Sequence, residues 1–84
     1  MRPEDVVKRV KPAYPLLSRR KGEQGEVLLR VFVDESGYVE NIRLERSSGH
    51  DMLNHSAIKA VQAWSFTPGE ARELFVPVQF TLVH

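Results

Sequence analysis

Apolar residues alternate with other residues in the segment EVLLRVFV, residues 26–33. This alternation predicts a β-strand with one buried face. Val27, Leu29, Val31 and Val33 lie on one face of this strand, and Leu28, Arg30 and Phe32 lie on the other. A hairpin turn is predicted at residues 34–37, where Gly37 can adopt a positive φ. A second strand is predicted at residues 38–46, with a bulge near Glu40 and Asn41 because the alternation slips there.

A longer spacing follows, with apolar residues at i, i+4, i+7, i+8 and i+11, and it predicts one buried stripe on a helix of about three turns. The stripe comprises Leu53, Ala57, Ala60, Val61 and Trp64. The polar positions expected away from it are Asn54, Lys59 and Gln62. Ser48 and Asp51 stand three residues apart before the stripe, which predicts a capping box at the helix start.

The last apolar segment, LFVPVQFTLV at residues 74–83, predicts a strand that carries no charge and contains Pro77. Proline lacks the N–H that a central strand needs, so it favours an edge position. The residues expected to face the helix are Leu74, Val76, Val78, Phe80 and Leu82.

The N-terminal segment predicts two short helices. Pro3 followed by acidic residues suits the first turn of a helix over residues 3–10, with Val6, Val7 and Val10 as its apolar positions. Residues 11–15 are expected to be extended because of their prolines. Pro15 then starts a second short helix, which the turn at Lys21 and Gly22 closes.

These elements predict one two-layer α+β domain over residues 1–84, with a three-stranded antiparallel sheet and one main helix on one face. The first two strands form a hairpin, and the helix returns the chain, so the last strand pairs with the first. The spatial order is then second, first, last. The last strand is an edge strand.

Charged side chains usually protect an edge strand from pairing with another chain. Only one edge of this predicted sheet carries such charges. The second strand carries Glu40, Arg43, Glu45 and Arg46. The last strand is unprotected, and its residues Phe75, Pro77, Gln79 and Thr81 are expected to direct their backbone groups outward. Such an edge suits β-augmentation, in which an incoming peptide adds a strand. Two alternatives would occupy the edge instead: residues 1–13, or a second copy of the chain.

Charge is uneven although the net charge is only +1. The basic residues of the first segment are Arg2, Lys8, Arg9, Lys11, Arg19, Arg20 and Lys21. Such a segment suits either a solvated lead-in or a surface that binds nucleic acid or another acidic partner. The motif Gly22-Glu23-Gln24-Gly25 resembles the loop that clamps RNA in some RNA-binding domains, but here it leads into a strand. A helix-ending turn is therefore expected instead. We expect no nucleic-acid partner.

Catalytic and metal sites are not expected. His50 and His55 are five residues apart, which does not place two ligands on one helix face. Ser48, His50 and Asp51 are neighbours without a nucleophile motif. There is no cysteine and no apolar run of membrane-spanning length. We therefore expect no enzyme, no metal and no cofactor.

Several short motifs in order resemble the C-terminal domain of TonB-type energy transducers. They are Tyr14-Pro15, Gly25-Glu26-Val27, Gly37-x-Val39, Ser47-Ser48-Gly49, Ala60-Val61-x-x-Trp64-x-Phe66-x-Pro68 and Val76-Pro77-Val78-x-Phe80-x-Leu82. The resemblance covers about residues 12–82. Two departures are Ser65, where the family commonly has arginine, and Ser18, in a region that commonly carries alanine.

This resemblance implies a periplasmic domain of a protein anchored in the inner membrane of a Gram-negative bacterium. Residues 1–11 would be a partly flexible lead-in from a missing spacer, and residues 12–84 the folded core. The family implies three further expectations: a proton-driven motor complex acts through the missing N-terminal part, the domain grasps the TonB box of outer-membrane receptors, and the cargo is a siderophore or a similar compound.

The family also indicates which residues bind the TonB box, through the last strand and the segment around Tyr14. The expected binding residues are Phe75, Val76, Pro77, Val78, Gln79, Phe80, Thr81, Leu82, Pro12, Tyr14 and Pro15. Two alternatives remain open at this point: a module that forms a homodimer through its last strand, and an RNA-binding module.

Overall fold

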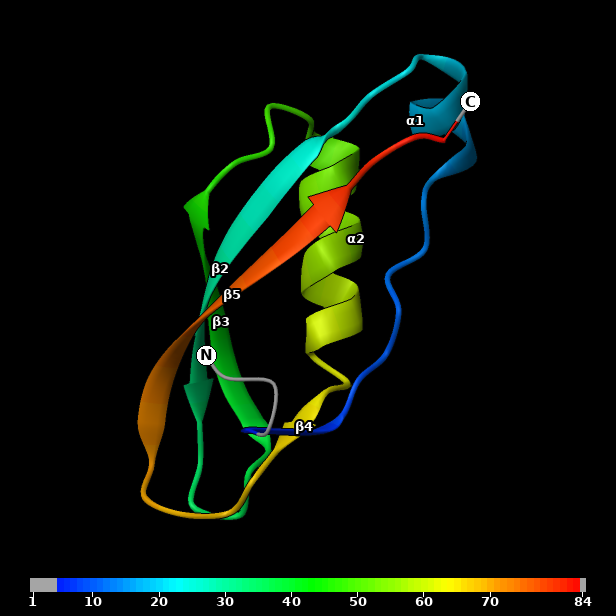
Figure 1. Cartoon of the computed structure of the whole chain (residues 1–84). Coiled ribbons are helices and arrows are strands. Elements are labelled where there is room, and N and C mark those ends of the chain that lie inside the picture. The colour runs from blue at the N-terminus through cyan, green and yellow to red at the C-terminus, as the bar shows by residue number, and fades with distance from the viewer. Residues whose placement is uncertain (1–4, 84) are drawn as a thin grey trace.

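The computed structural model describes residues 5–83. In chain order its elements are β1 (Val6–Lys8), α1 (Leu16–Arg20), β2 (Gly25–Val33), β3 (Val39–Arg46), α2 (Asp51–Val61), β4 (Ser65–Phe66) and β5 (Arg72–Phe80). Figure 1 shows α2 packed on one face of the twisted sheet, with α1 at one tip of the domain. Neither helix of the described chain is long and apolar enough to cross a membrane.

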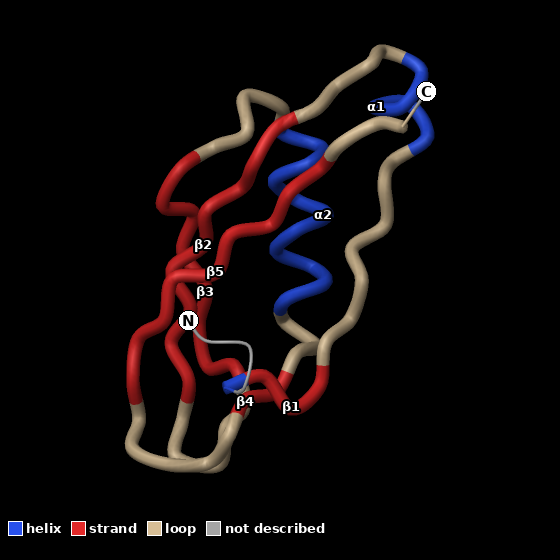
Figure 2. The backbone as a smooth tube through the Cα atoms, viewed as in Figure 1, coloured by secondary structure: helices blue, strands red, loops and turns tan. Residues whose placement is uncertain are grey.

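The three long strands form an antiparallel sheet in the order β3-β2-β5 (Figure 2), so the predicted strand order is confirmed. The predicted bulge is also present. Phe32 lies opposite Asn41, whereas the next residue, Val33, lies opposite Val39. Glu40 is therefore the extra residue of the bulge, at the position where the alternation slips.

The core lies between this sheet and α2. Val27, Leu29, Val31 and Val33, which the alternation places on one face of β2, are all buried. The helix stripe is buried too, although Trp64 follows the end of α2 at Val61. β5 contributes Val76, Val78 and Phe80. Each such side chain stabilises the fold by about 1.5–3 kcal/mol when it leaves water, so this layer is the main source of stability.

The helix predicted over residues 3–10 is wrong in its described part, because Val6–Lys8 form the strand β1. β1 pairs antiparallel with β4, which the sequence analysis did not foresee, and Val6 lies opposite Phe66. Apolar residues at positions 6, 7 and 10 fit a helix and a strand equally. An isolated short helix is marginal in water, whereas pairing with β4 satisfies backbone groups of both segments. Residues 3 and 4 lie outside the described residues.

The second predicted short helix is confirmed as α1, with Pro15 as its N-cap residue. The predicted turn follows it, since the Gly22 N–H donates to the Arg19 carbonyl at 3.1 Å and Gly22 has φ +71°. α1 buries Ser18 and leaves Leu16 and Leu17 exposed.

The predicted capping box at the start of α2 is wrong. His50 is the N-cap residue, and the structure shows no side-chain cap there. Ser48 instead donates its backbone N–H to Asn54 Oδ1 at 2.9 Å, and Asn54 Nδ2 donates to Ser47 Oγ at 2.8 Å. Asn54 is only 6% exposed, so its predicted position away from the buried face is also wrong. Burial is tolerated because these hydrogen bonds satisfy its amide.

The predicted hairpin turn is confirmed, and Gly37 has φ +90°. A Cβ atom on Gly37 would lie 1.9 Å from the Phe66 carbonyl oxygen. The Phe66 N–H donates to the Gly37 carbonyl at 2.7 Å. The turn thus docks directly on β4, which only a residue without a side chain permits.

The last strand lies nearer the N-terminus than predicted, at Arg72–Phe80 rather than at residues 74–83. It therefore includes Arg72 and Glu73, and the prediction that this strand carries no charge is wrong. Its ends match those of its neighbour, because Arg72 lies opposite Val33 and Phe80 lies opposite Gly25. The length of β2 therefore decides where β5 begins and ends.

Candidate functional site

β5 is an edge strand whose hydrogen-bonded neighbour is β2. Within residues 5–83, no strand pairs with its other side. Residues 5–13 add no strand to that side: β1 pairs with β4, and residues 9–13 lie beside the edge without forming a strand on it. The alternative that the N-terminal segment covers the edge is therefore not seen for residues 5–13.

The side chains on the two faces of β5 differ in their exposure to solvent. Val76, Val78 and Phe80 are buried against the core, whereas Pro77 and Gln79 are exposed. Just beyond the strand, the Leu82 N–H donates to Gln24 Oε1 at 2.9 Å. Backbone groups alternate in direction along a strand, so even-numbered residues face β2 and odd-numbered residues face the free edge. Pro77, which has no N–H, falls in the free set.

An extended segment, residues 9–14, runs beside this edge and is fastened at several points. The Trp64 indole N–H donates to the Val10 carbonyl at 2.7 Å. The Ser56 hydroxyl donates to the Ala13 carbonyl, and the Tyr14 hydroxyl donates to the Glu23 carbonyl. The bonds from Trp64 and Ser56 span 54 and 43 residues of the chain, so the position of this segment depends on the tertiary fold.

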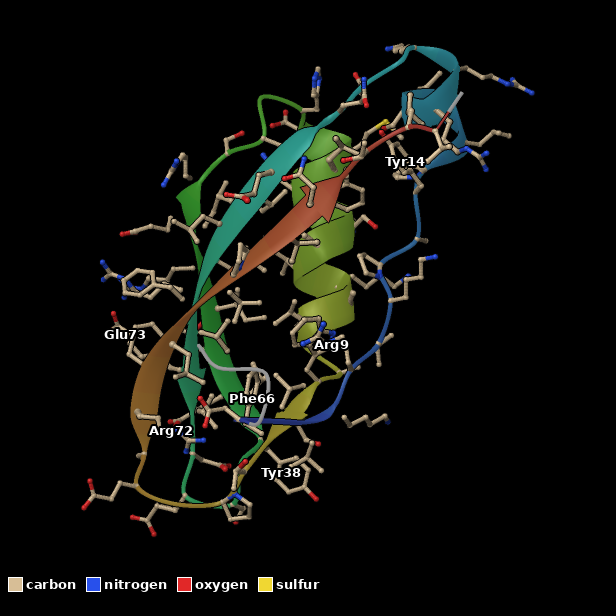
Figure 3. The ribbon with its side chains drawn as sticks, viewed as in Figure 1. Arg9, Tyr14, Tyr38, Phe66, Arg72 and Glu73 are labelled. Carbon is tan, nitrogen blue, oxygen red and sulfur yellow. The ribbon has the colours of Figure 1, made fainter. Side chains whose placement is uncertain are left out.

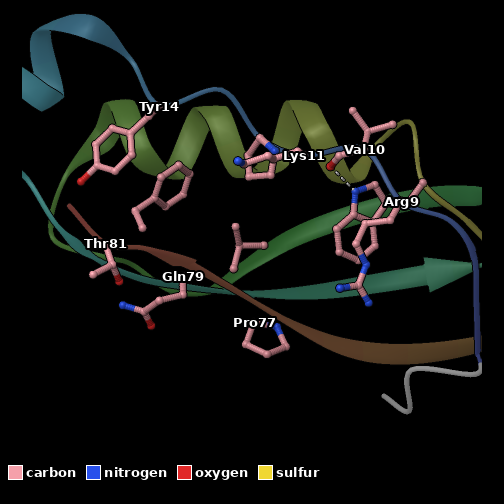
Figure 4. Close-up of a pocket in the computed structure, with 11 residues that line it drawn as sticks. Arg9, Val10, Lys11, Tyr14, Pro77, Gln79 and Thr81 are labelled. Atoms are coloured by element: carbon pink, nitrogen blue, oxygen red, sulfur yellow. Dashed lines mark hydrogen bonds between the residues drawn. The ribbon is translucent and has the colours of Figure 1, made fainter. Parts of the chain in front are cut away.

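A groove of about 640 Å³ lies between residues 9–14 and β5. Figure 4 shows Tyr14, Lys11 and Arg9 along one wall and Thr81, Gln79 and Pro77 along the other. Its lining residues are Arg9, Val10, Lys11, Pro12, Tyr14, Trp64, Pro77, Val78, Gln79, Phe80 and Thr81. The groove thus combines a free strand edge with apolar and aromatic walls.

Aromatic contacts define both ends of the groove. The Tyr14 and Phe80 rings meet edge to face, with centroids 5.3 Å apart and planes at 88°. At the other end the Arg9 guanidinium lies 5.1 Å from the centroid of Trp64, a cation–π contact. Arg9 and Lys11 are the cations of the groove, and its described lining contains no carboxylate. The groove is therefore positively charged.

Most of the predicted binding residues come together in this groove. Those that line it are Pro12, Tyr14, Pro77, Val78, Gln79, Phe80 and Thr81. Val76 is fully buried in the core, and Leu82 lies past the strand. Phe75 lies on the other face of the sheet, where Arg30 is 5.6 Å from its ring centroid. Pro15 lines a separate hollow beside α2.

Four lining residues were missed by sequence reasoning: Arg9, Val10, Lys11 and Trp64. Arg9 and Lys11 carried a signal, since both belong to the basic first segment. Trp64 was assigned to the core, where most of its surface indeed lies, at 6% exposed. Nothing in the local pattern indicates that Trp64 meets Val10, because that contact is made by the folded chain.

The two histidines show no shared site. His50 Nδ1 lies 3.3 Å from Glu23 Oε2, whereas His55 lines the hollow beside α2. No group of three or more potential metal ligands occurs among the described residues.

Comparison with known proteins gives a consistent match. The family model described as Gram-negative bacterial TonB protein C-terminal matches residues 10–83. Protein tonB2 of Pseudomonas aeruginosa is 44% identical over 77 residues, which cover 84% of this chain and 28% of that protein. Protein TonB of Neisseria meningitidis serogroup C is 43% identical over 72 residues, which cover 86% of this chain and 26% of that protein. The chain thus spans about a quarter of these relatives' length.

Solved structures resemble the fold as well. The solution NMR structure of the Pseudomonas aeruginosa TonB CTD has a TM-score of 0.81 at 20% identity, covering 92% of this chain and 84% of that one. The Helicobacter pylori TonB-CTD (residues 194-285) has a TM-score of 0.71 at 29% identity, covering 84% of this chain and 80% of that one.

Proposed function

Because the chain belongs to the family of C-terminal domains of Gram-negative TonB proteins, we propose that it binds the TonB box of an outer-membrane receptor at the β5 edge. The observation that carries this proposal is the unpaired edge of β5 beside an open groove. An extended peptide placed there adds a fourth strand to the sheet by β-augmentation.

The free edge supplies the main-chain bonds. The backbone groups of Phe75, Gln79 and Thr81 point outward by alternation, whereas Pro77 offers only its carbonyl. These bonds provide affinity that is largely independent of the peptide sequence. The side chains along the groove, from Tyr14 to Lys11, supply selectivity. Its cations favour a peptide with a carboxylate near the Arg9 end.

A strand is well suited to carrying a mechanical load. Pulling along a paired strand loads several backbone hydrogen bonds together in shear, whereas peeling from one end breaks them in turn. This supports a role in transmitting energy derived from the proton-motive force to receptors that import siderophores or similar cargo. The domain itself is then a non-enzymatic binding module in the periplasm, and a longer protein would connect it to an inner-membrane motor complex.

Force spectroscopy checks the mechanical part. A TonB-box peptide attached at one end loads the bonds in shear, and the same peptide attached at its other end unzips them. We expect a higher rupture force in shear, and equal rupture forces in the two geometries would contradict the proposed load path.

An NMR titration of the labelled 84-residue chain with a synthetic TonB-box peptide tests the binding proposal. Amide shifts are expected at Phe75, Gln79, Thr81 and in residues 9–14. Shifts confined to β3, the other edge, or no saturable shift at all, would overturn it. A molecular mass that rises to that of a dimer as the chain concentration increases, together with no peptide binding by the dimer, would instead show that a second copy occupies the edge.

A further inference from the structure

The short helix α1 has an inverted arrangement of polar and apolar residues. Ser18 is fully buried, and its hydroxyl has no hydrogen-bond partner among the described residues. The two leucines beside it point outward, with Leu16 62% and Leu17 47% exposed. A helix that packed only for its own stability would bury leucine rather than an unbonded hydroxyl. The outward leucines are therefore available to something outside the domain.

Three cations follow these leucines after the buried Ser18. Arg19, Arg20 and Lys21 are consecutive and exposed. The ion pairs between described residues involve Arg30 and the His50 imidazole, so these three cations have no carboxylate partner among the described residues. We call Leu16, Leu17, Arg19, Arg20 and Lys21 the α1 patch. It combines an apolar centre with unneutralised positive charge.

The surface beside the α1 patch continues its apolar character. A hollow of about 490 Å³ begins at Pro15 and includes Met52, which is 39% exposed. Lys59 and Asp51 also line this hollow, so its own charges balance. The carboxylates that follow the patch in the chain are those of Glu23, which lies 3.3 Å from His50 Nδ1, and of Glu26, which is exposed at the start of β2. Three consecutive cations outnumber these two carboxylates, so this end of the domain keeps a net positive charge.

The location of the patch decides which partner it fits. α1 projects at one tip of the elongated domain, next to the described C-terminal end of the chain, as Figures 1 and 2 both show. Val83 at that end is 95% exposed. A projecting apolar tip with a rim of cations matches a flat bilayer surface, in which apolar side chains enter the interface and cations meet anionic headgroups.

We infer that the α1 patch is a reversible attachment site for a bilayer containing anionic phospholipid. Leu16 and Leu17 enter the interface, and Arg19, Arg20 and Lys21 bind the headgroups. The Tyr14 and Thr81 end of the groove opens toward the same tip (Figures 3 and 4), so attachment places the free edge of β5 near the lipid surface. This inference does not depend on which peptide the edge binds.

Vesicle sedimentation with the 84-residue chain tests the inference, using phosphatidylcholine vesicles with and without phosphatidylglycerol. Binding is expected only with phosphatidylglycerol and is expected to weaken as salt rises. R19Q/R20Q is expected to lose roughly 25-fold in partitioning, since each surface cation contributes about fivefold. L16Q/L17Q keeps the helix propensity of α1 and is expected to lose about tenfold or more.

Two matched controls separate the patch from general stickiness. R43Q/R46Q removes two exposed cations from β3 and is expected to leave partitioning nearly unchanged. Tyr38 is 64% exposed at the opposite end of the domain (Figure 3), so Y38Q is expected to be silent too. The substituted side chains are exposed, so all four variants are expected to fold. Thermal melts check this.

Several outcomes would overturn the inference. They are absence of binding to phosphatidylglycerol vesicles at low salt, equal losses in R19Q/R20Q and R43Q/R46Q, and full binding by L16Q/L17Q. Loss of binding to an acidic receptor segment in R19Q/R20Q, without any vesicle binding, would assign the patch to a protein partner instead. TonB-box affinity measured on the same variants reports on the β5 edge separately, so the two proposals fail independently.

Discussion

Trp64 and Val10 are joined across 54 residues of chain by one hydrogen bond, from the indole N–H to the carbonyl oxygen at 2.7 Å. The bond holds residues 9–14 in place as the wall of the groove opposite β5 (Figure 4). The same indole packs into the core and carries the Arg9 guanidinium on its face. One side chain therefore couples the stability of the domain to the width of the proposed binding site.

Trp64→Phe keeps an aromatic ring in the core but removes the N–H. We expect a loss of about 1–2 kcal/mol in the free energy of unfolding, because a part-buried bond to the Val10 carbonyl disappears. Peptide affinity is expected to fall several-fold as residues 9–14 loosen. Urea denaturation and hydrogen exchange of the Lys11 amide measure both effects. Arg9→Gln, which leaves the indole bond in place, serves as the control; faster exchange in that variant alone would contradict this account.

Proline substitutions distinguish the two sides of β5. Gln79→Pro removes an N–H that points to the free edge, so we expect weaker TonB-box binding and a smaller loss of stability. Val78→Pro removes an N–H that faces β2 and is expected to cost about 3 kcal/mol or more. Gln79→Ala, which keeps the N–H, should retain peptide affinity. The measurements are thermal melts with titrations, and a large loss of stability with unchanged affinity in Gln79→Pro would contradict the outward assignment.

Ser18→Ala removes a buried hydroxyl that has no partner among the described residues. We expect the free energy of unfolding to rise by about 1 kcal/mol, because the cost of desolvating that hydroxyl disappears. Ser56→Ala is the matched variant, since its hydroxyl does donate to the Ala13 carbonyl, and it should lower stability by a similar amount. Urea denaturation of both variants tests the comparison. Destabilisation by Ser18→Ala would show that its hydroxyl is satisfied in solution.

Gly37 and Gly22 both have positive φ but differ in their surroundings. Gly22→Ala meets no atom within 4 Å, so it should cost only the backbone strain of about 1–2 kcal/mol. Gly37→Ala also drives a Cβ into the Phe66 carbonyl and is expected to cost more than about 3 kcal/mol. Thermal melts of the two variants give the comparison directly. Equal costs would mean that the turn shifts away from β4 without penalty.

The pattern of apolar residues was sufficient to predict an element wherever one periodicity, of a strand or of a helix, dominates the segment. The alternation of β2, the bulge at Glu40 and the stripe of α2 were all predicted, because each depends on which face of a single element is buried. It was insufficient for β1, since apolar residues at positions 6, 7 and 10 fit two periods. It also failed for Asn54, whose burial depends on partners from Ser47 and Ser48 that lie outside the helix.

Side-chain periodicity and the missing N–H of Pro77 are local properties, so the amino-acid sequence alone specifies a helix-covered antiparallel sheet with its last strand at an edge. The pairing of β1 with β4, the separation of residues 9–14 from β5 and the groove between them arise only when the chain folds. Those features depend on contacts such as Trp64 with Val10, and a contact between distant residues leaves no periodic trace in the chain.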